Sequence, residues 1–182
     1  MTCLVWNCQG LGGSWTIRHL SDLVKRYNPP LVFLVETKCH SKKIESVKRR
    51  LNMYGIGVDS RGKGGGLALL WNKSSFVNLL SFLDSHIDTV IQLDEGEDSW
   101  RFTGFYGAPE TSNRSASWNL LRCLSGLSTF PWVCAGDFNA ILVDSEKKGA
   151  VITPPWQLRD FREALNDSGL FELVLKDSRY LG

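Results

Sequence analysis

The sequence has no apolar run of membrane-spanning length, and no positively charged start followed by an apolar stretch. These absences exclude a transmembrane helix and a secretory signal within the 182 residues. Net charge is also small, at +2 from 21 Lys and Arg against 19 Asp and Glu, which excludes a globally basic nucleic-acid binder but not a local basic face. Repeats, linkers and low-complexity tracts are absent as well. We therefore expect residues 1–182 to form a single soluble, intracellular domain.

The number and spacing of the cysteines argue against a disulfide framework and against a zinc site built on paired cysteines. The five cysteines are Cys3, Cys8, Cys39, Cys123 and Cys134. An odd number of scattered cysteines in mostly apolar surroundings is typical of free thiols in a reducing compartment rather than of a disulfide framework. No C-x2-C pair is present, so a structural zinc site built on paired cysteines is excluded as well.

Apolar and aromatic residues are plentiful, and their spacing predicts alternating helices and strands. Hydrophobic residues make up 43% of the chain and aromatic residues 11%, which argues against disorder. Apolar residues three and four apart predict helices at 15–27, 41–51, 117–127 and 155–165, with Ser41 as a candidate N-cap. Apolar runs predict strands at 4–6, 31–35, 53–58, 67–71, 76–82, 89–93, 100–106 and 132–135. This order predicts an α/β or α+β layered sandwich with mixed sheets.

Four of these strands end in a polar side chain that could carry chemistry. The four side chains are those of Asn7, Glu36, Tyr106 and Asp137, and Asn139 lies two residues beyond the last. Ligands of layered α/β folds bind beyond strand ends, so these positions are natural site candidates. In extended geometry, Asp137 and Asn139 would leave the same face of the chain. Turns favour Asn, Asp and Gly for conformational reasons, so each residue taken singly is more simply explained as part of a turn.

Five segments around these residues occur in an order that resembles a known family. They are VWNCQGLG at 5–12, FLVETK at 33–38, GGLALLW at 65–71, FYG at 105–107 and AGDFN at 135–139. Their amino-acid sequences are similar to the motifs of the exonuclease–endonuclease–phosphatase family, and within it to those of the endonuclease domain of plant LINE-type retrotransposons. A single segment of this kind is weak evidence, whereas five in order, with a resemblance running from residue 3 to the C-terminus, favour the family.

The resemblance implies a four-layered sandwich of two mixed β-sheets flanked by helices, and hydrolysis of phosphodiester bonds with a divalent metal. Mg2+ is the expected ion and Mn2+ an alternative; Glu36 resembles the glutamate that binds it, and Asn7 the supporting asparagine. Tyr106 resembles the tyrosine that contacts the phosphate. Asp137 resembles the aspartate that orients or deprotonates the attacking water, and Asn139 an amide donor to the phosphate. These residue types suit the chemistry, because Mg2+ prefers one or two carboxylates with water and phosphate oxygens.

The family's C-terminal Asp–His motif, and the earlier aspartate that orients its histidine, cannot be placed in this sequence. The three histidines are His19 in the first predicted helix, His40 after the Glu36 segment, and His86 before a strand of the β-rich middle. Residues 176–182 resemble the stretch just upstream of the family's Phe-Thr-Trp segment, which precedes the missing motif, so we expect a truncated domain whose second half is incomplete. Because such a histidine contributes about 10²–10⁴-fold to the rate, we expect hydrolysis to be weak or absent.

The leading hypothesis is a Mg2+-dependent, DNA-nicking endonuclease domain derived from a LINE-type element. We expect DNA as its partner, no membrane, a monomeric state, and a nuclear location if it is functional. The first alternative is a non-catalytic nucleic-acid-binding remnant or an unselected gene fragment, and the second is a phosphatase of the same family. The basic segment 42–50 fits either a solvated helix face or a contact with DNA phosphates. The glycines of 62–66 lack phosphate-loop spacing, so we expect them to join two strands.

Overall fold

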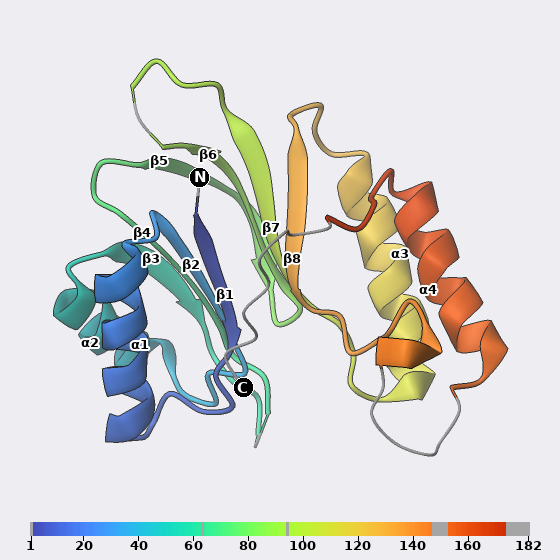
Figure 1. The fold of residues 1–182 in the computed structure, drawn as a ribbon, viewed down its shortest axis with the longest axis horizontal. Helices are drawn as coiled ribbons and strands as arrows, with labels where there is room; N and C mark the ends of the chain where they lie inside the picture. The colour runs from blue at the N-terminus through green and yellow to red at the C-terminus, as the bar shows by residue number, and fades with distance from the viewer. Residues whose placement is uncertain (1, 63, 94, 147–152, 174–182) are drawn as a thin grey trace.

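Two four-stranded sheets pack face to face, and two helices cover the outer face of each sheet (Figure 1). The structure is a computed structural model that describes residues 2–62, 64–93, 95–146 and 153–173. The strands are β1 (Cys3–Asn7), β2 (Leu31–Val35), β3 (Tyr54–Val58), β4 (Leu67–Trp71), β5 (Phe76–Leu83), β6 (His86–Gln92), β7 (Trp100–Tyr106) and β8 (Trp132–Asp137). The helices are α1 (Ser14–Tyr27), α2 (Ser41–Leu51), α3 (Arg114–Ser125) and α4 (Pro155–Asp167), with short 3-10 turns η1 (Thr111–Asn113) and η2 (Asp144–Glu146).

The first sheet has the strand order β1-β2-β4-β3. β1 and β2 run parallel, with Asn7 opposite Val35, and the other neighbours are antiparallel. Every residue of β2 is buried, as its continuous apolar sequence predicted for a strand covered on both faces. α1 connects the parallel pair, so β1 and β2 end at the same edge of the sheet.

The second sheet has the strand order β5-β6-β7-β8. Its parallel pair is β7 and β8, connected through α3, with Tyr106 opposite Asp137. The pairs β5–β6 and β6–β7 are antiparallel, so this sheet is mixed like the first. The carboxyl ends of β1, β7 and β8 lie together at the lower edge of the sandwich in Figure 1.

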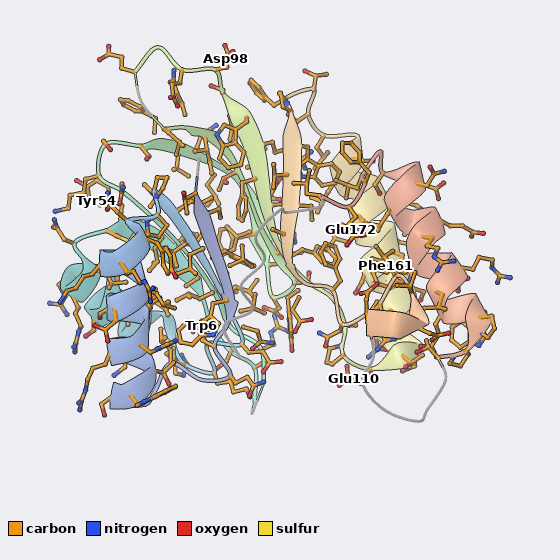
Figure 2. The ribbon with its side chains drawn as sticks, in the orientation of Figure 1. Trp6, Tyr54, Asp98, Glu110, Phe161 and Glu172 are labelled. Atoms are coloured by element: carbon orange, nitrogen blue, oxygen red, sulfur yellow. The ribbon has the colours of Figure 1, made fainter. Side chains whose placement is uncertain are left out.

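The core has three parts, one between the sheets and one under each helix pair. Between the sheets, Phe33 of β2 and Phe102 of β7 meet edge to face with ring centroids 6.0 Å apart. The sheets approach so closely here that a Cβ on Gly104 would lie 2.3 Å from the Phe33 ring. On the far side, Trp118 of α3 stacks on Phe161 of α4, which Figure 2 labels. The expected sandwich of two mixed sheets flanked by helices is thus confirmed.

All predicted helices and strands are present, but two local details were wrong. Ser41 is not a cap: α2 begins at Ser41 after the N-cap His40, and the Ser41 backbone N–H donates to Asp59 Oδ1 at 2.6 Å. Asp59 follows β3, so this cap comes from outside the helix and is not visible in its local sequence. His86 is the first residue of β6 rather than the residue before a strand. The segment 176–182 lies outside the described residues.

A buried ion pair links the second sheet to α3. Arg101 of β7 and Asp88 of β6 are both fully buried, and two hydrogen bonds of 2.9 and 2.8 Å join the guanidinium to the carboxylate. The Thr103 hydroxyl donates to the same carboxylate at 2.7 Å, and Arg101 also donates to the Leu124 carbonyl in the last turn of α3 at 2.7 Å. The Trp132 ring packs against the guanidinium. Loss of either charged partner would leave an uncompensated buried charge, which is strongly destabilising.

Candidate active site

The polar residues that end the two parallel strand pairs converge at one edge of the sandwich. Asn7 at the end of β1 donates from Nδ2 to Asp137 Oδ2 at 2.8 Å, at the end of β8. Tyr106 at the end of β7 donates its hydroxyl to Glu36 Oε1 at 3.1 Å, just beyond β2. Both bonds cross from one sheet to the other, so four of the five predicted site residues belong to one cluster. The fifth residue, Asn139, contacts Asp137 through its backbone N–H.

Glu36 is held in an uncommon backbone conformation by the segments on either side of it. Its φ of +54° lies in the left-handed region, which costs a residue with a Cβ about 1–2 kcal/mol. The Thr37 N–H donates to the Gly66 carbonyl at 3.0 Å, and the Thr37 carbonyl accepts from the Leu11 N–H at 2.7 Å. Gly66 has φ +84°, and a Cβ there would lie 2.5 Å from Thr37 Oγ1. The Gly-Gly sequence before β4 therefore allows the close approach that fixes Glu36.

The Glu36 carboxylate accepts from donors on two sides, and one donor is a lysine that sequence reasoning missed. Lys38 Nζ lies 3.1 Å from Glu36 Oε2, opposite the oxygen that accepts from Tyr106. Partial burial by itself raises the pKa of Glu36, but hydrogen bonds from Lys38, Tyr106 and Asn7, together with the Lys38 charge, bring that pKa below its usual value. Glu36 is therefore a charged anion near neutral pH. The only signal for Lys38 in the sequence was its place in the ETK segment.

Tyr106 is set up as a hydrogen-bond donor. Burial and the negative charge of the neighbouring Glu36 raise the pKa of its phenol to about 12. The phenol therefore keeps its proton well above neutral pH. A donor fixed at the edge of a carboxylate cluster can stabilise negative charge that develops on a substrate oxygen.

Asp137 and Asn139 do not point the same way, because β8 ends at Asp137 and the chain then turns. Asn139 has φ +51°, and its backbone N–H donates to Asp137 Oδ1 at 2.9 Å. Its side-chain Nδ2 donates to the Gly107 carbonyl at 2.8 Å. The extended geometry expected for this pair was thus wrong. Asn139 braces the ends of β7 and β8 and holds the Asp137 carboxylate through its backbone.

The histidines of the chain are engaged away from this cluster. His19 stacks on Trp15 within α1 at a centroid distance of 5.3 Å. His40 lies 2.9 Å from the Asp59 carboxylate, and His86 is buried in β6. Within the described ranges, none of them hydrogen-bonds to a site carboxylate.

The donor set fits a hard divalent cation such as Mg2+. Glu36 and Asp137 supply carboxylate oxygens, and Asn7 supplies an amide oxygen. In the described part of the chain, no group of three or more His, Cys, Asp or Glu side chains could enclose a metal ion. Mg2+ commonly takes only one or two protein carboxylates and completes its shell with water and substrate phosphate, whereas zinc sites need three or four His, Cys or carboxylate ligands. The site thus suits Mg2+ better than zinc.

Comparison with known sequences identifies one matching family. The family model described as the Endonuclease/Exonuclease/phosphatase family matches residues 4–172. No curated protein matches the sequence significantly.

Solved structures of similar fold include DNA-processing enzymes. The AP endonuclease LMAP from Leishmania major gives a TM-score of 0.68 at 15% identity, covering 91% of this chain and 66% of the other. An AP endonuclease from Archaeoglobus fulgidus gives 0.64 at 16% identity, covering 90% and 69%. The 3′ phosphatase NExo from Neisseria, bound to a product DNA hairpin, gives 0.66 at 13% identity, covering 91% and 70%. At such identities the likeness shows the fold, and the chain spans about two thirds of the length of these structures.

Proposed function

Because the chain belongs to the endonuclease/exonuclease/phosphatase family, we propose that it hydrolyses phosphodiester bonds of DNA with Mg2+ at the strand-end cluster. The observation that carries this proposal is the pair of hydrogen bonds between the sheets, Asn7 to Asp137 at 2.8 Å and Tyr106 to Glu36 at 3.1 Å. Two carboxylates, an amide and a protonated phenol at one edge are groups that can assist metal-dependent phosphoryl transfer.

Each residue of the cluster has a role that follows from its contacts. Glu36, with Asn7, would hold Mg2+, which when bound polarises the phosphoryl oxygen and stabilises the leaving oxygen. Asp137 accepts from Asn7 and from the Asn139 backbone, so its carboxylate is oriented from two sides and would position and deprotonate the attacking water. The Tyr106 phenol stays protonated, and its O–H would donate a hydrogen bond to a phosphate oxygen.

We further assign the chain to the LINE-type retrotransposon branch of the family, as a DNA-nicking domain. This assignment is supported by the amino-acid sequences and the order of the five segments between residues 5 and 139, which resemble those of that branch. DNA is the proposed partner, in keeping with the similar Neisseria phosphatase that is bound to a DNA hairpin. Of the helices in the described ranges, none has the length and apolar character to cross a membrane. We also propose that the chain acts as a monomer in the nucleus.

A second candidate function is binding of nucleic acid without hydrolysis. The observation that favours it is the engagement of all three histidines elsewhere, as described above. A histidine acting as general acid or base contributes about 10²–10⁴-fold to the rate, so a site whose described part contains none could bind nucleic acid and hydrolyse it slowly or not at all.

Plasmid nicking tests the proposal. Supercoiled DNA is incubated with the chain and Mg2+, beside Glu36→Ala, Asp137→Ala and a control in which EDTA removes the metal. Slow nicking that needs Mg2+ and both carboxylates is the expected result. Nicking that survives both substitutions would remove the assignment of these residues, and binding of DNA without any Mg2+-dependent nicking would select the second candidate function.

A further inference from the structure

Positive charge is concentrated in the first third of the chain. Residues 1–58 hold nine of the 21 Lys and Arg side chains but only three of the 19 Asp and Glu side chains. Most of these cations lie on α1 and α2, the two helices that cover the outer face of the first sheet (Figure 1). A chain with little net charge thus has one strongly basic layer.

A groove between these helices contains two of the cations. It has a volume of about 260 Å³ and is lined by Lys43 and Arg50 of α2, by Ser14 and Ser46, and by the apolar side chains of Ile17 and Val47. Glu45, the single acidic residue of α2, is 2.7 Å from Lys48 and is neutralised by it. Lys43 and Arg50 form no side-chain ion pair with any residue that the structure describes. No carboxylate lines the groove, so its charge is available to an anion.

The spacing of the two cations suits a chain of phosphates. Lys43 and Arg50 are seven residues apart on one helix, which places them about 10 Å apart along its axis. Two neighbouring phosphates of a polynucleotide could therefore each contact one of the two cations. The hydroxyls of Ser14 and Ser46 supply neutral donors in the same groove.

An exposed aromatic stack stands at the same end of α1. Trp15, next in sequence to Ser14, is 71% exposed and stacks on His19 with an interplanar angle of 3°. His19 in turn contacts the edge of the Trp6 ring at a centroid distance of 5.5 Å, and Figure 2 labels Trp6 between β1 and α1. Trp6 and Asn7 are consecutive residues of β1, so their side chains leave opposite faces of the strand, and the stack lies on the helix side of the first sheet. A large indole that remains mostly in solvent is available for a further ring.

We infer that the α1–α2 groove and Trp15 together bind an unpaired nucleic-acid strand on the helix-covered side of the first sheet. This inference rests on the proposed function and adds a place where an unpaired stretch of the DNA would be held. Cationic side chains would contact consecutive phosphates, and a base would stack on the indole, which is how proteins hold single strands without reading their sequence. A base in a regular duplex has both faces covered by its neighbours and cannot use Trp15 in this way.

Binding of a fluorescent oligonucleotide, measured by anisotropy in EDTA, separates strand recognition from hydrolysis. The wild-type chain should bind single-stranded DNA more tightly than duplex of the same length. Charge reversal by Lys43→Glu with Arg50→Glu should reduce the slope of log affinity against log salt by about 1.4, which corresponds to two phosphate contacts on a single strand. Trp15→Ala should weaken single-strand binding roughly 10-fold and leave duplex binding unchanged.

Matched variants control for charge and for loss of an indole. Lys73→Glu with Arg159→Glu makes the same change of net charge outside the groove, and Trp156→Ala removes a half-exposed tryptophan from α4. Circular dichroism and thermal unfolding establish that each variant folds. Controls that weaken binding as much as the groove variants, a wild-type chain that binds duplex equally well, or no binding of single strands at all would each overturn the inference.

Failure of this inference differs from failure of the proposed function. Glu36→Ala should abolish Mg2+-dependent nicking while leaving binding of the single strand in EDTA within about two-fold, because Glu36 does not line the groove. Nicking that persists in the groove variants with unchanged strand binding would reject the groove and leave the strand-end assignment intact.

Discussion

The side-chain amide of Asn7 donates to the Asp137 carboxylate at 2.8 Å, from one sheet to the other and across 130 residues of sequence. The bond joins the ends of two strands that lie in different layers, so the position of Asp137 depends on the packing of the whole sandwich. It also occupies the Asp137 oxygen opposite the one that accepts from Asn139.

Asn7→Ala should therefore slow hydrolysis. A hydrogen bond to a charged group is worth about 1.5–3 kcal/mol, and its loss from the transition state corresponds to a rate lower by a factor of roughly 10–150. Plasmid nicking under single-turnover conditions measures this effect. Asn78→Ala, on an exposed position of β5, should leave the rate unchanged. Equal rates for Asn7→Ala and wild type would mean that the bond does not orient the reacting groups.

Tyr106→Phe should lower the hydrolysis rate by about 10²-fold, the effect of removing one fixed donor from a developing negative charge. Because the pKa of Tyr106 is raised to about 12, its phenol stays protonated up to that pH. The donor is therefore present throughout the neutral and moderately alkaline range and is lost only as the pH rises through about 12. The ratio of wild-type to Tyr106→Phe rates should accordingly be constant between about pH 7 and pH 10, and Tyr54→Phe on β3 serves as the control. A ratio that falls across this range would indicate a phenol that ionises earlier.

Lys38→Met should strengthen Mg2+ binding. The Lys38 ammonium lies 3.1 Å from Glu36 Oε2 and competes with any cation for that carboxylate. Partly exposed ion pairs of this kind contribute up to about 1 kcal/mol, so the dissociation constant for Mg2+ should fall by up to about five-fold. Calorimetric titration with Mg2+ tests this without any need for activity, and Lys73→Met provides a control away from the site. Weaker binding in Lys38→Met would mean that the lysine supports the metal site instead.

Breaking the buried ion pair of Asp88 and Arg101 should be among the substitutions that lower the free energy of unfolding most. Asp88→Asn leaves the fully buried guanidinium without its counter-charge, so the free energy of unfolding should fall by about 3–5 kcal/mol. Asp167→Asn, which breaks the half-exposed pair with Arg122, should cost no more than about 1 kcal/mol. Urea unfolding measures both values. The double variant Asp88→Leu with Arg101→Met should recover part of the loss, and similar costs for the buried and exposed pairs would contradict this account.

Much of the fold could be predicted from sequence, because apolar residues that are buried on one face of a helix or strand recur along the chain at the period of that element. The apolar run of β2 and the spaced apolar residues of α1 lie where their patterns placed them. The order of strands in each sheet could not be derived from periodicity, which carries no information about neighbours. The family resemblance predicted two mixed sheets flanked by helices, but it did not give the order of the strands.

The candidate site was predictable in composition but not in detail. Asn7, Glu36, Tyr106 and Asp137 were candidates as polar residues at strand ends, and the family resemblance selected them. The structure brings the four together at one edge. The orientation of Asn139 could not, since it depends on where β8 stops and on a carbonyl of Gly107. Contacts such as these are set by backbone turns and by residues distant in sequence, which local pattern does not encode.

The concentration of cations on α1 and α2 makes the molecule an electric dipole. In the field of a polyanion, such a molecule experiences a torque that turns its helical layer towards the nucleic acid before any contact is made. The effect extends over roughly one Debye length, about 8 Å at physiological ionic strength. Orientation of this kind raises the fraction of productive encounters, so the association rate should depend on salt more steeply than the dissociation rate does.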